Sequence, residues 1–369
     1  MPSKTGKSSS KIVPKPGRSG AFVIAEIGKN FIISEQDESP ETYLKRAKDL
    51  IRESYEAGAD AVKFQTHHFE DEQIPEKIFS PHFNGADRYN WVLRNSRLTP
   101  IEFWREIKNY ADHLGIQFFI TPMSRGAVRK VADLSLPFWK IGSGDVTDFL
   151  MIDELAKFNK PIIISTGMVS LKELDKVVSY IRAKGVRPVI MYCVSKYPAP
   201  KEAFNLGTIE FLKEKYPDLQ IGFSDHSVDN HDIALSAVAL GASLIEKHVS
   251  YSRDHWGPDH KASLTFAELR ELVEEIRSGT KKLEVGDFYG SKGKELAGAT
   301  SEFRPFFRKA FVAARDIKKG EVITLDNILA MRPALLLGGI PSEDLTKVVG
   351  KKANCGIKKL NPIKAENLN

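Results

Sequence analysis

Short apolar runs alternate with longer amphipathic stretches from Ala21 to about Gly279. Eight short runs are rich in apolar and β-branched residues, which predicts buried strands. They cover residues 22–27, 60–65, 117–121, 138–142, 161–166, 188–193, 221–224 and 243–248. Between and after them, apolar residues recur at helical spacing. The predicted helices lie near residues 41–57, 100–114, 124–134, 148–158, 170–184, 205–215, 229–240 and 265–278.

Eight strand–helix repeats predict a (β/α)8 TIM barrel spanning residues 20–279. An open doubly wound sheet is the alternative, but it usually has fewer strands. The first strand also lacks the glycine-rich turn of a dinucleotide-binding sheet. The connection between Gln65 and Thr99 is long, and in a barrel it would lie on the catalytic face. We therefore expect it to form a lid or a wall of the substrate site.

The strand–helix alternation stops after Gly279. Residues 280–308 are charged and glycine-rich and predict a linker, whose last residues include the aromatic cluster Phe303, Phe306 and Phe307. Residues 309–369 predict a small C-terminal domain of mostly short strands and turns. A module of this size has a marginal core of its own, so we expect it to pack on the barrel or on another subunit.

The net charge of +6 arises at the two ends of the chain. Residues 1–19 are basic, rich in Ser, Pro and Gly and poor in apolar residues, which predicts a disordered tail. Aromatic residues are not interleaved with the bases as in a single-strand groove, so no nucleic-acid partner is expected. No run approaches the roughly 18 apolar residues of a membrane span, so no membrane partner is expected either. The absence of a secretory signal and the presence of only two cysteines favour a cytoplasmic protein.

Polar residues gather at the carboxyl ends of the predicted strands, which in a barrel converge on one mouth. Burying so many charges without a function would cost several kcal/mol each. The pattern therefore predicts an active site. Its members, in chain order, are Glu26, Asn30, Lys63, Gln65, Thr121, Lys140, Ser143, Asp145, Ser165, Thr166, Ser195, Lys196, Tyr197, Asp225, His226, Glu246 and His248.

Two of these side chains, Lys63 and Lys140, interrupt apolar strands. Such a lysine either extends its stem to reach solvent or directs its ammonium at an anion. Because two lysines from different strands face one mouth, we favour the second interpretation. They suit a substrate that carries phosphate and carboxylate groups.

His226 and His248 end the last two strands, which are neighbours in a barrel. A lone histidine is more often a satisfied core or surface group than a ligand. Two imidazoles on adjacent strand ends could instead hold one divalent ion with open positions for water and substrate. The segment 257–263 reads, by spacing alone, as a turn before the last helix, with Ser263 or Thr265 as the N-cap. Cys193 has no base beside it in the sequence and reads as an inert packing thiol.

Seven motifs resemble the sialic acid synthase family, and the C-terminal module resembles the antifreeze-like (SAF) domain that ends these enzymes. The likeness covers about residues 20–369. The motifs are Ile24–Gly28, Ala61–Gln65, Lys140–Asp145, Ile164–Met168, Ser224–His226, Glu246–His248 and Gly257–Lys261.

The resemblance implies condensation of phosphoenolpyruvate with an open-chain N-acylated mannosamine-type sugar, giving a nine-carbon 2-keto acid and phosphate. It implies a divalent metal cofactor, Mn²⁺ or Mg²⁺, that polarises the aldehyde. It also implies a domain-swapped homodimer in which each C-terminal domain covers the partner's active site.

The resemblance also implies roles for individual residues. Catalysis would fall to Glu26, Lys63, Lys140 and Glu246, and metal binding to His226 and His248. Phosphoenolpyruvate would be bound by Lys63, Lys140, Ser143 and Ser165, and we add Thr121 at the end of the third strand. The sugar would contact Gln65, Ser195, Tyr197, Asp259 and, across the dimer, Arg332.

Two positions depart from the family pattern near the expected sugar site. Phe31 follows Asn30 where a histidine is common, and Ser195 stands where some relatives have asparagine. The identity of the sugar therefore stays open, and a precursor of legionaminic or pseudaminic acid is an alternative. Two other functions also stay open: a condensing enzyme or aldolase that builds shorter keto acids, and a non-catalytic carbohydrate-binding barrel.

Overall fold

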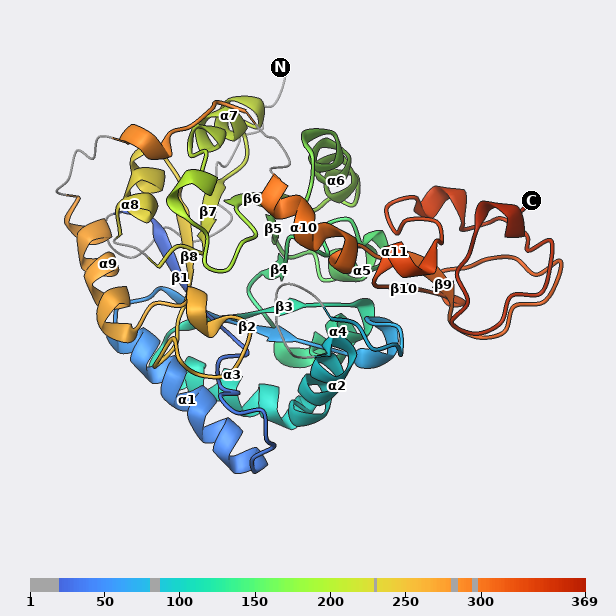
Figure 1. The fold of residues 1–369 in the computed structure, drawn as a ribbon, viewed down its shortest axis with the longest axis horizontal. Coiled ribbons are helices and arrows are strands. Elements are labelled where there is room, and N and C mark those ends of the chain that lie inside the picture. Colours follow the sequence, from blue (N-terminus) through green and yellow to red (C-terminus); the bar gives the residue numbers. More distant parts are fainter. Residues whose placement is uncertain (1–19, 80–86, 229–230, 280–284, 294–297) are drawn as a thin grey trace, which may run out of the picture.

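The computed structural model describes residues 20–79, 87–228, 231–279, 285–293 and 298–369. The predicted basic tail, residues 1–19, lies outside this part of the chain, as does His82 in the long connection. Figure 1 shows a barrel surrounded by helices, with the C-terminal domain attached at one side.

Eight parallel strands form one sheet in the order β3-β2-β1-β8-β7-β6-β5-β4. The end strands β3 and β4 also lie side by side, which closes the sheet into the predicted TIM barrel. The strands are β1 (Phe22–Gly28), β2 (Ala61–Thr66), β3 (Gln117–Pro122), β4 (Trp139–Ile141), β5 (Ile162–Ser165), β6 (Pro188–Cys193), β7 (Ile221–Asp225) and β8 (Leu244–His248). All eight coincide with predicted strands to within a few residues.

Helices cover the outside of the barrel, and apolar side chains on their inner faces pack against the strands. Ser170 caps α6 and Thr265 caps α9, each in a reciprocal arrangement with a glutamate three residues later. The helices of the barrel are α1 (Pro40–Glu56), α2 (Arg88–Leu98), α3 (Ile101–Leu114), α4 (Arg125–Lys130), α5 (Phe149–Ala156), α6 (Leu171–Ala183), α7 (Gly207–Lys215), α8 (Asp232–Ala239) and α9 (Phe266–Ser278).

In the part of the chain that the structure describes, the barrel interior contains no channel. A cluster of buried side chains fills it, separate from the layer between the strands and the helices. Phe119 and Phe138 lie in edge-to-face contact within it, with their ring centroids 4.5 Å apart. These apolar side chains fill the interior, so the polar side chains at the carboxyl ends of the strands form the bottom of a cavity. The members of the cluster are Phe22, Ile24, Ala61, Phe119, Phe138, Ile163, Val189, Met191 and Leu244.

Two helices lie where the sequence predicted only connections. Helix α2 occupies part of the long connection after β2, and α10 (Gly298–Phe307) occupies the end of the predicted linker 280–308. Figure 1 shows α10 running from the barrel toward the C-terminal domain, close to the β4–β6 side. The linker is therefore partly structured, and it carries aromatic side chains to the barrel mouth.

The C-terminal domain consists of short strands and turns, as predicted. Strands β9 (Ala310–Ala313) and β10 (Ile328–Met331) pair antiparallel, followed by the single-turn α11 (Ala334–Leu337). A small apolar cluster joins this domain to the connection after β2, with Ile74 and Ile78 packed against Val312 and Met331. The domain thus packs on the barrel of its own chain. Within the described residues, no helix is long and apolar enough to span a membrane.

Candidate active site

A cavity that is partly open to solvent lies at the carboxyl ends of the strands. Residues from all eight barrel strands or the loops that follow them line it, as expected for this fold. Further lining residues come from α2 and from Phe307 at the end of α10. The predicted site residues that line the cavity are Glu26, Lys63, Gln65, Thr121, Lys140, Ser143, Asp145, Ser165, Tyr197, His226, Glu246, His248 and Asp259.

Glu26, Lys63 and Glu246 form a buried cluster on neighbouring strands. Lys63 Nζ lies 2.7 Å from Glu26 Oε2 and 3.6 Å from Glu246 Oε1, and it donates to Thr121 Oγ1 at 2.9 Å. Burial raises the pKa of Glu26 above its usual value despite the opposing charge of Lys63. Burial would also raise the pKa of Glu246, but the charges of Lys140 and Lys63 outweigh it and lower this pKa to about 2. The pKa values of the two carboxyl groups thus shift in opposite directions, so Glu246 is ionised and Glu26 is better able to hold a proton.

Lys140 approaches the same carboxylate from the other side. Its Nζ lies 3.6 Å from Glu246 Oε1 and donates to Ser165 Oγ at 2.7 Å. Burial lowers the pKa of Lys140. Glu246, the one described carboxylate within ion-pair distance, raises it but does not offset the effect of burial. The hydroxyl of Ser143 accepts a hydrogen bond from the Gly167 backbone N–H at 3.0 Å. Two ammonium groups and three hydroxyls thus surround one side of the cavity, an arrangement suited to an anion.

His226 and His248 stand beside each other with their ring centroids 5.4 Å apart. His226 Nδ1 lies 2.7 Å from the Val194 carbonyl oxygen, so this nitrogen must carry the proton and Nε2 keeps a free lone pair. Burial lowers the pKa of His248 to about 3, and its Nδ1 has no hydrogen-bond partner among the described residues. His248 therefore suits metal binding as a neutral imidazole. Burial acts to lower the pKa of His226, but Cys193 and the Val194 carbonyl raise it above its usual value, so His226 could bind a metal through Nε2 only in its neutral form. The described residues contain no cluster of three or more His, Cys, Asp or Glu side chains with metal-binding geometry.

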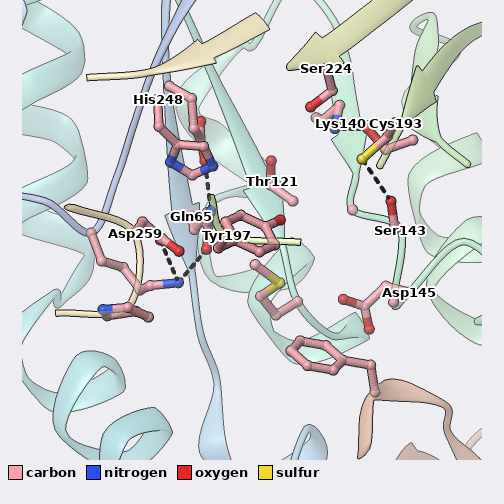
Figure 2. A pocket seen from close by; sticks show the side chains of 18 of the residues that line it. Gln65, Thr121, Lys140, Ser143, Asp145, Cys193, Tyr197, Ser224, His248 and Asp259 are labelled. Atoms are coloured by element: carbon pink, nitrogen blue, oxygen red, sulfur yellow. Dashed lines mark hydrogen bonds and ion pairs between the residues drawn. The ribbon is translucent and has the colours of Figure 1, made fainter. Parts of the chain in front are cut away.

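The remaining predicted sugar-site residues line the side of the cavity nearest His248. Figure 2 shows Gln65, Tyr197 and Asp259 around this histidine, across the cavity from Ser143 and Lys140. The Tyr197 ring packs on His226 with centroids 4.1 Å apart. Gln65 donates to Glu26 Oε1 at 2.7 Å, which links this side of the cavity to the Glu26 carboxyl group.

Two predicted sugar-binding residues do not line the cavity. Ser195 is buried, with its Oγ 3.8 Å from the Cys193 sulfur and close to Gly167. Arg332 is fully buried between the C-terminal domain and the barrel of the same chain, where it is paired with Asp145. A role for Arg332 across a dimer interface stays a prediction.

The structure also adds lining residues that the sequence analysis had not assigned to the site. Lys29 donates a short hydrogen bond to Gln65 and lies 3.7 Å from Asp259. Cys193 lines the cavity, although its thiol read as an inert packing group. Arg88 and Phe307 come from the two helices that were not predicted. No periodic or motif signal marks Arg88, whereas Phe307 belongs to the aromatic cluster at the end of the predicted linker. The aromatic cluster at 303–307 was the one signal that pointed to this segment.

Comparison with known proteins places this geometry in a family. Residues 50–287 match the NeuB family, and residues 308–369 match the SAF domain. The chain belongs to the NeuB family. Human N-acetylneuraminate-9-phosphate synthase is 32% identical over 341 residues, covering 91% of this chain and 89% of that protein. The N,N'-diacetyllegionaminic acid synthase of Campylobacter jejuni is 32% identical over 331 residues, covering 88% and 96%.

The fold is also shared with a solved structure over nearly the whole chain. The spore coat polysaccharide biosynthesis protein SpsE of Bacillus subtilis matches with a TM-score of 0.77 and 28% identity, covering 97% of this chain and 99% of that one. The NeuB-family chain is therefore an enzyme of the sialic acid synthase type, which supports a role in making nonulosonic acids.

Proposed function

We propose that the enzyme condenses phosphoenolpyruvate with the open-chain form of an N-acylated mannosamine-type sugar. The product is a nine-carbon 2-keto acid, and phosphate is released. The observation that carries this proposal is the convergence of Lys63 and Lys140 on Glu246 inside one cavity. Two buried ammonium groups on different strands provide the fixed positive charge that a substrate with three negative charges requires.

Phosphoenolpyruvate would lie against Lys63 and Lys140, with hydroxyl groups completing its contacts. Thr121 and Ser165 already accept hydrogen bonds from these two lysines, so each hydroxyl proton remains available for donation to a substrate oxygen. Ser143, on the same side, accepts from a backbone N–H and donates to the Cys193 sulfur at 3.6 Å, a weak acceptor that a substrate oxygen could replace. The fixed cations would also stabilise the charge that develops at the phosphate as its bond to carbon breaks.

The reaction joins C3 of phosphoenolpyruvate to the aldehyde carbon, and water adds to C2. One proton of the water ends on the former aldehyde oxygen, and the other leaves with the phosphate. Glu26 is suited to hold a proton during this exchange, because burial raises its pKa and Gln65 fixes its carboxyl group. Holding both substrates in one cavity would supply much of the remaining rate.

A divalent metal, Mn²⁺ or Mg²⁺, is part of the proposal, and His226 and His248 would hold it. The free Nε2 lone pair of His226 and the neutral ring of His248 fit such a role. When bound, the metal would supply a Lewis acid for the sugar aldehyde. Gln65, Tyr197 and Asp259 would orient the sugar beside these histidines.

The setting in which the enzyme works is also proposed. Cys193 and Cys355 are both free thiols, which fits a reducing, cytoplasmic compartment. A homodimer with exchanged C-terminal domains stays a prediction, since the described chain seats Arg332 against its own barrel.

Phosphate release from phosphoenolpyruvate tests the proposed function. The protein should release phosphate with Mn²⁺ or Mg²⁺ only when an N-acylated amino sugar is added. A panel of N-acetylmannosamine, its 6-phosphate, a 2,4-diacetamido-trideoxy sugar and arabinose 5-phosphate would identify the acceptor. Release with the phosphorylated pentose alone would reassign the enzyme to the synthesis of shorter keto acids.

A further inference from the structure

Two charged residues at the ends of β7 and β8 do not line the cavity, although each stands next to a histidine that does. Asp225 directly precedes His226, and Lys247 directly precedes His248. Successive side chains of a strand point to opposite faces, so Asp225 and Lys247 point toward the layer between the strands and the helices. The two residues lie opposite each other in the register of β7 and β8.

Asp225 and Lys247 form a buried ion pair that brackets the backbone of His226. Lys247 Nζ lies 2.9 Å from Asp225 Oδ2 and donates to the Ser227 carbonyl oxygen at 2.6 Å. The other carboxylate oxygen, Asp225 Oδ1, accepts from the Ser227 N–H at 2.8 Å. The residues before and after His226 are therefore tied to each other and to β8.

This ion pair interrupts a layer that is otherwise apolar. The preceding outward-facing residues of the two strands, Phe223 and Ile245, belong to the hydrophobic core. The side chains of Asp225 and Lys247 are 1% and 3% exposed. A buried ion pair is often no more stabilising than well-packed apolar side chains of similar volume, because both charges lose their hydration. The stability of the fold therefore gives little reason for the pair, and its place beside His226 indicates a local role.

The two candidate metal ligands differ in how the sheet holds them. His248 is the last residue of β8 and is paired in register with Glu26 on β1. His226 lies one residue beyond the end of β7, so the strand pairing does not fix its backbone. The Val194 carbonyl orients its ring, and its own carbonyl oxygen accepts from the Ala199 N–H at 3.0 Å. The ion pair supplies the restraint from the β8 side.

We propose that Asp225 and Lys247 are positioning residues that hold His226 at the distance from His248 that binding of one divalent metal ion requires. They act through the backbone on either side of His226, and their side chains reach neither the cavity nor a substrate. Outer partners that orient a metal ligand are typically worth about 10- to 100-fold in metal affinity. This inference rests on the metal site of the proposed function and names the part of the fold that sets its geometry.

Calorimetric titration of Mn²⁺ into the full-length protein, without substrates, tests this role. The variant combines Asp225→Asn with Lys247→Met, so no unpaired charge is left in the apolar layer. We expect it to bind Mn²⁺ about 10- to 100-fold more weakly than wild type, with a similar melting temperature. The concentration of Mn²⁺ that gives half-maximal activity should rise by the same factor. The KM for phosphoenolpyruvate, which depends on Lys63 and Lys140, should not change.

The combination of Asp60→Asn with Arg277→Met is the matched control. This ion pair of 2.5 Å joins the residue before β2 to α9, and neither residue lines the cavity. Its removal should leave the affinity for Mn²⁺ at the wild-type value. Asp225→Asn alone is the milder variant, because asparagine keeps an acceptor for the Ser227 N–H. It should lose a smaller part of the affinity, and it carries the test if the double variant does not fold.

The outcomes separate this inference from the proposed function. Wild-type affinity for Mn²⁺ in the folded variants at Asp225 and Lys247 would overturn the positioning role and leave the metal site standing. Equal losses of affinity in these variants and in the control would also overturn it, because the effect would then be one of general stability. A wild-type protein that bound neither Mn²⁺ nor Mg²⁺ would refute the metal site itself, and the positioning role with it.

Discussion

Glu26 and Lys63 occupy paired positions on β1 and β2, and their side chains form a buried ion pair of 2.7 Å at the floor of the cavity. Glu26 is also paired in register with His248 on β8. The strand register therefore brings a carboxyl group with a raised pKa, a candidate anion-binding ammonium and a candidate metal ligand to one level of the barrel.

Replacing Lys140 by Met should lower kcat/KM for phosphoenolpyruvate by about 100- to 1,000-fold, the size expected for a lost charge-stabilising donor. The change removes the hydrogen bond to Ser165 and leaves Glu246 with one cation fewer. Steady-state kinetics with varied phosphoenolpyruvate would measure it. Lys160→Met, an exposed lysine just before β5, serves as the control and should retain wild-type kinetics.

Removing divalent metal with a chelator should abolish turnover, and added Mn²⁺ or Mg²⁺ should restore it. His226→Gln should weaken metal binding, measured by calorimetry, by about tenfold or more while the protein stays folded. His231→Gln is the matched control, because His231 pairs with Glu275 outside the cavity. Full metal-dependent activity in His226→Gln would count against the metal site.

Gly144→Ala should loosen the docking of α10. A Cβ at Gly144 would lie 2.8 Å from the Phe307 side chain, closer than real contacts allow, so the helix must shift. We expect a cost of about 1–3 kcal/mol, seen as faster proteolysis near α10. Gly293→Ala provides the comparison, because nothing lies within 4 Å of its added Cβ. Equal proteolysis rates in both variants would show that Phe307 does not press on Gly144.

The stability of the protein should depend on Glu72 at low pH. Burial acts to raise the pKa of Glu72, but the hydrogen bond and charge of His67 and the charges of Arg332 and Lys309 lower it to about 2. A depressed folded-state pKa stabilises the protein above the unfolded value of 4.5, and this stabilisation is lost as the pH falls from about 4.5 toward 2. By linkage the contribution is at most ~3 kcal/mol.

Denaturant midpoints at pH 6.5, 4.5 and 3.0 would measure this dependence. Wild type should lose more stability than Glu72→Gln over this range, since the variant lacks the titrating group. Glu70→Gln, two residues away and exposed, should follow wild type. An equal fall of the denaturant midpoint with pH in wild type and Glu72→Gln would contradict this role of Glu72.

The barrel could be predicted from the sequence because each strand and helix carries its own periodic apolar pattern. Glycines at 58 and 241 follow α1 and α8 with φ of +88° and +93°, so even the helix ends were marked in the sequence. The lysines and histidines of the site were visible because each interrupts or ends an apolar strand. Because all eight strands are parallel, their carboxyl ends meet at one mouth, and the strand register then brings Glu26, Lys63 and His248 to one level.

Other parts of the site could not be predicted, because tertiary contacts alone create them. Helix α2 lies in a connection rich in proline and charge, and α10 lies in a segment that reads as a linker. Arg88 meets Phe307 across more than 200 residues, and no local pattern encodes that meeting. The buried pairing of Lys309 with Asp145 and Asp148, which fixes the C-terminal domain to the barrel, is equally non-local.

The most direct test of the central claim is the fate of phosphoenolpyruvate labelled with ¹³C at C3, followed by NMR in the presence of metal and the preferred amino sugar. The account predicts that the vinylic signal is replaced by that of a methylene carbon within a nine-carbon 2-keto acid, with one phosphate released for each new carbon–carbon bond. Labelled pyruvate beside unchanged sugar would contradict it, because the protein would then cleave phosphoenolpyruvate without joining it to a second substrate.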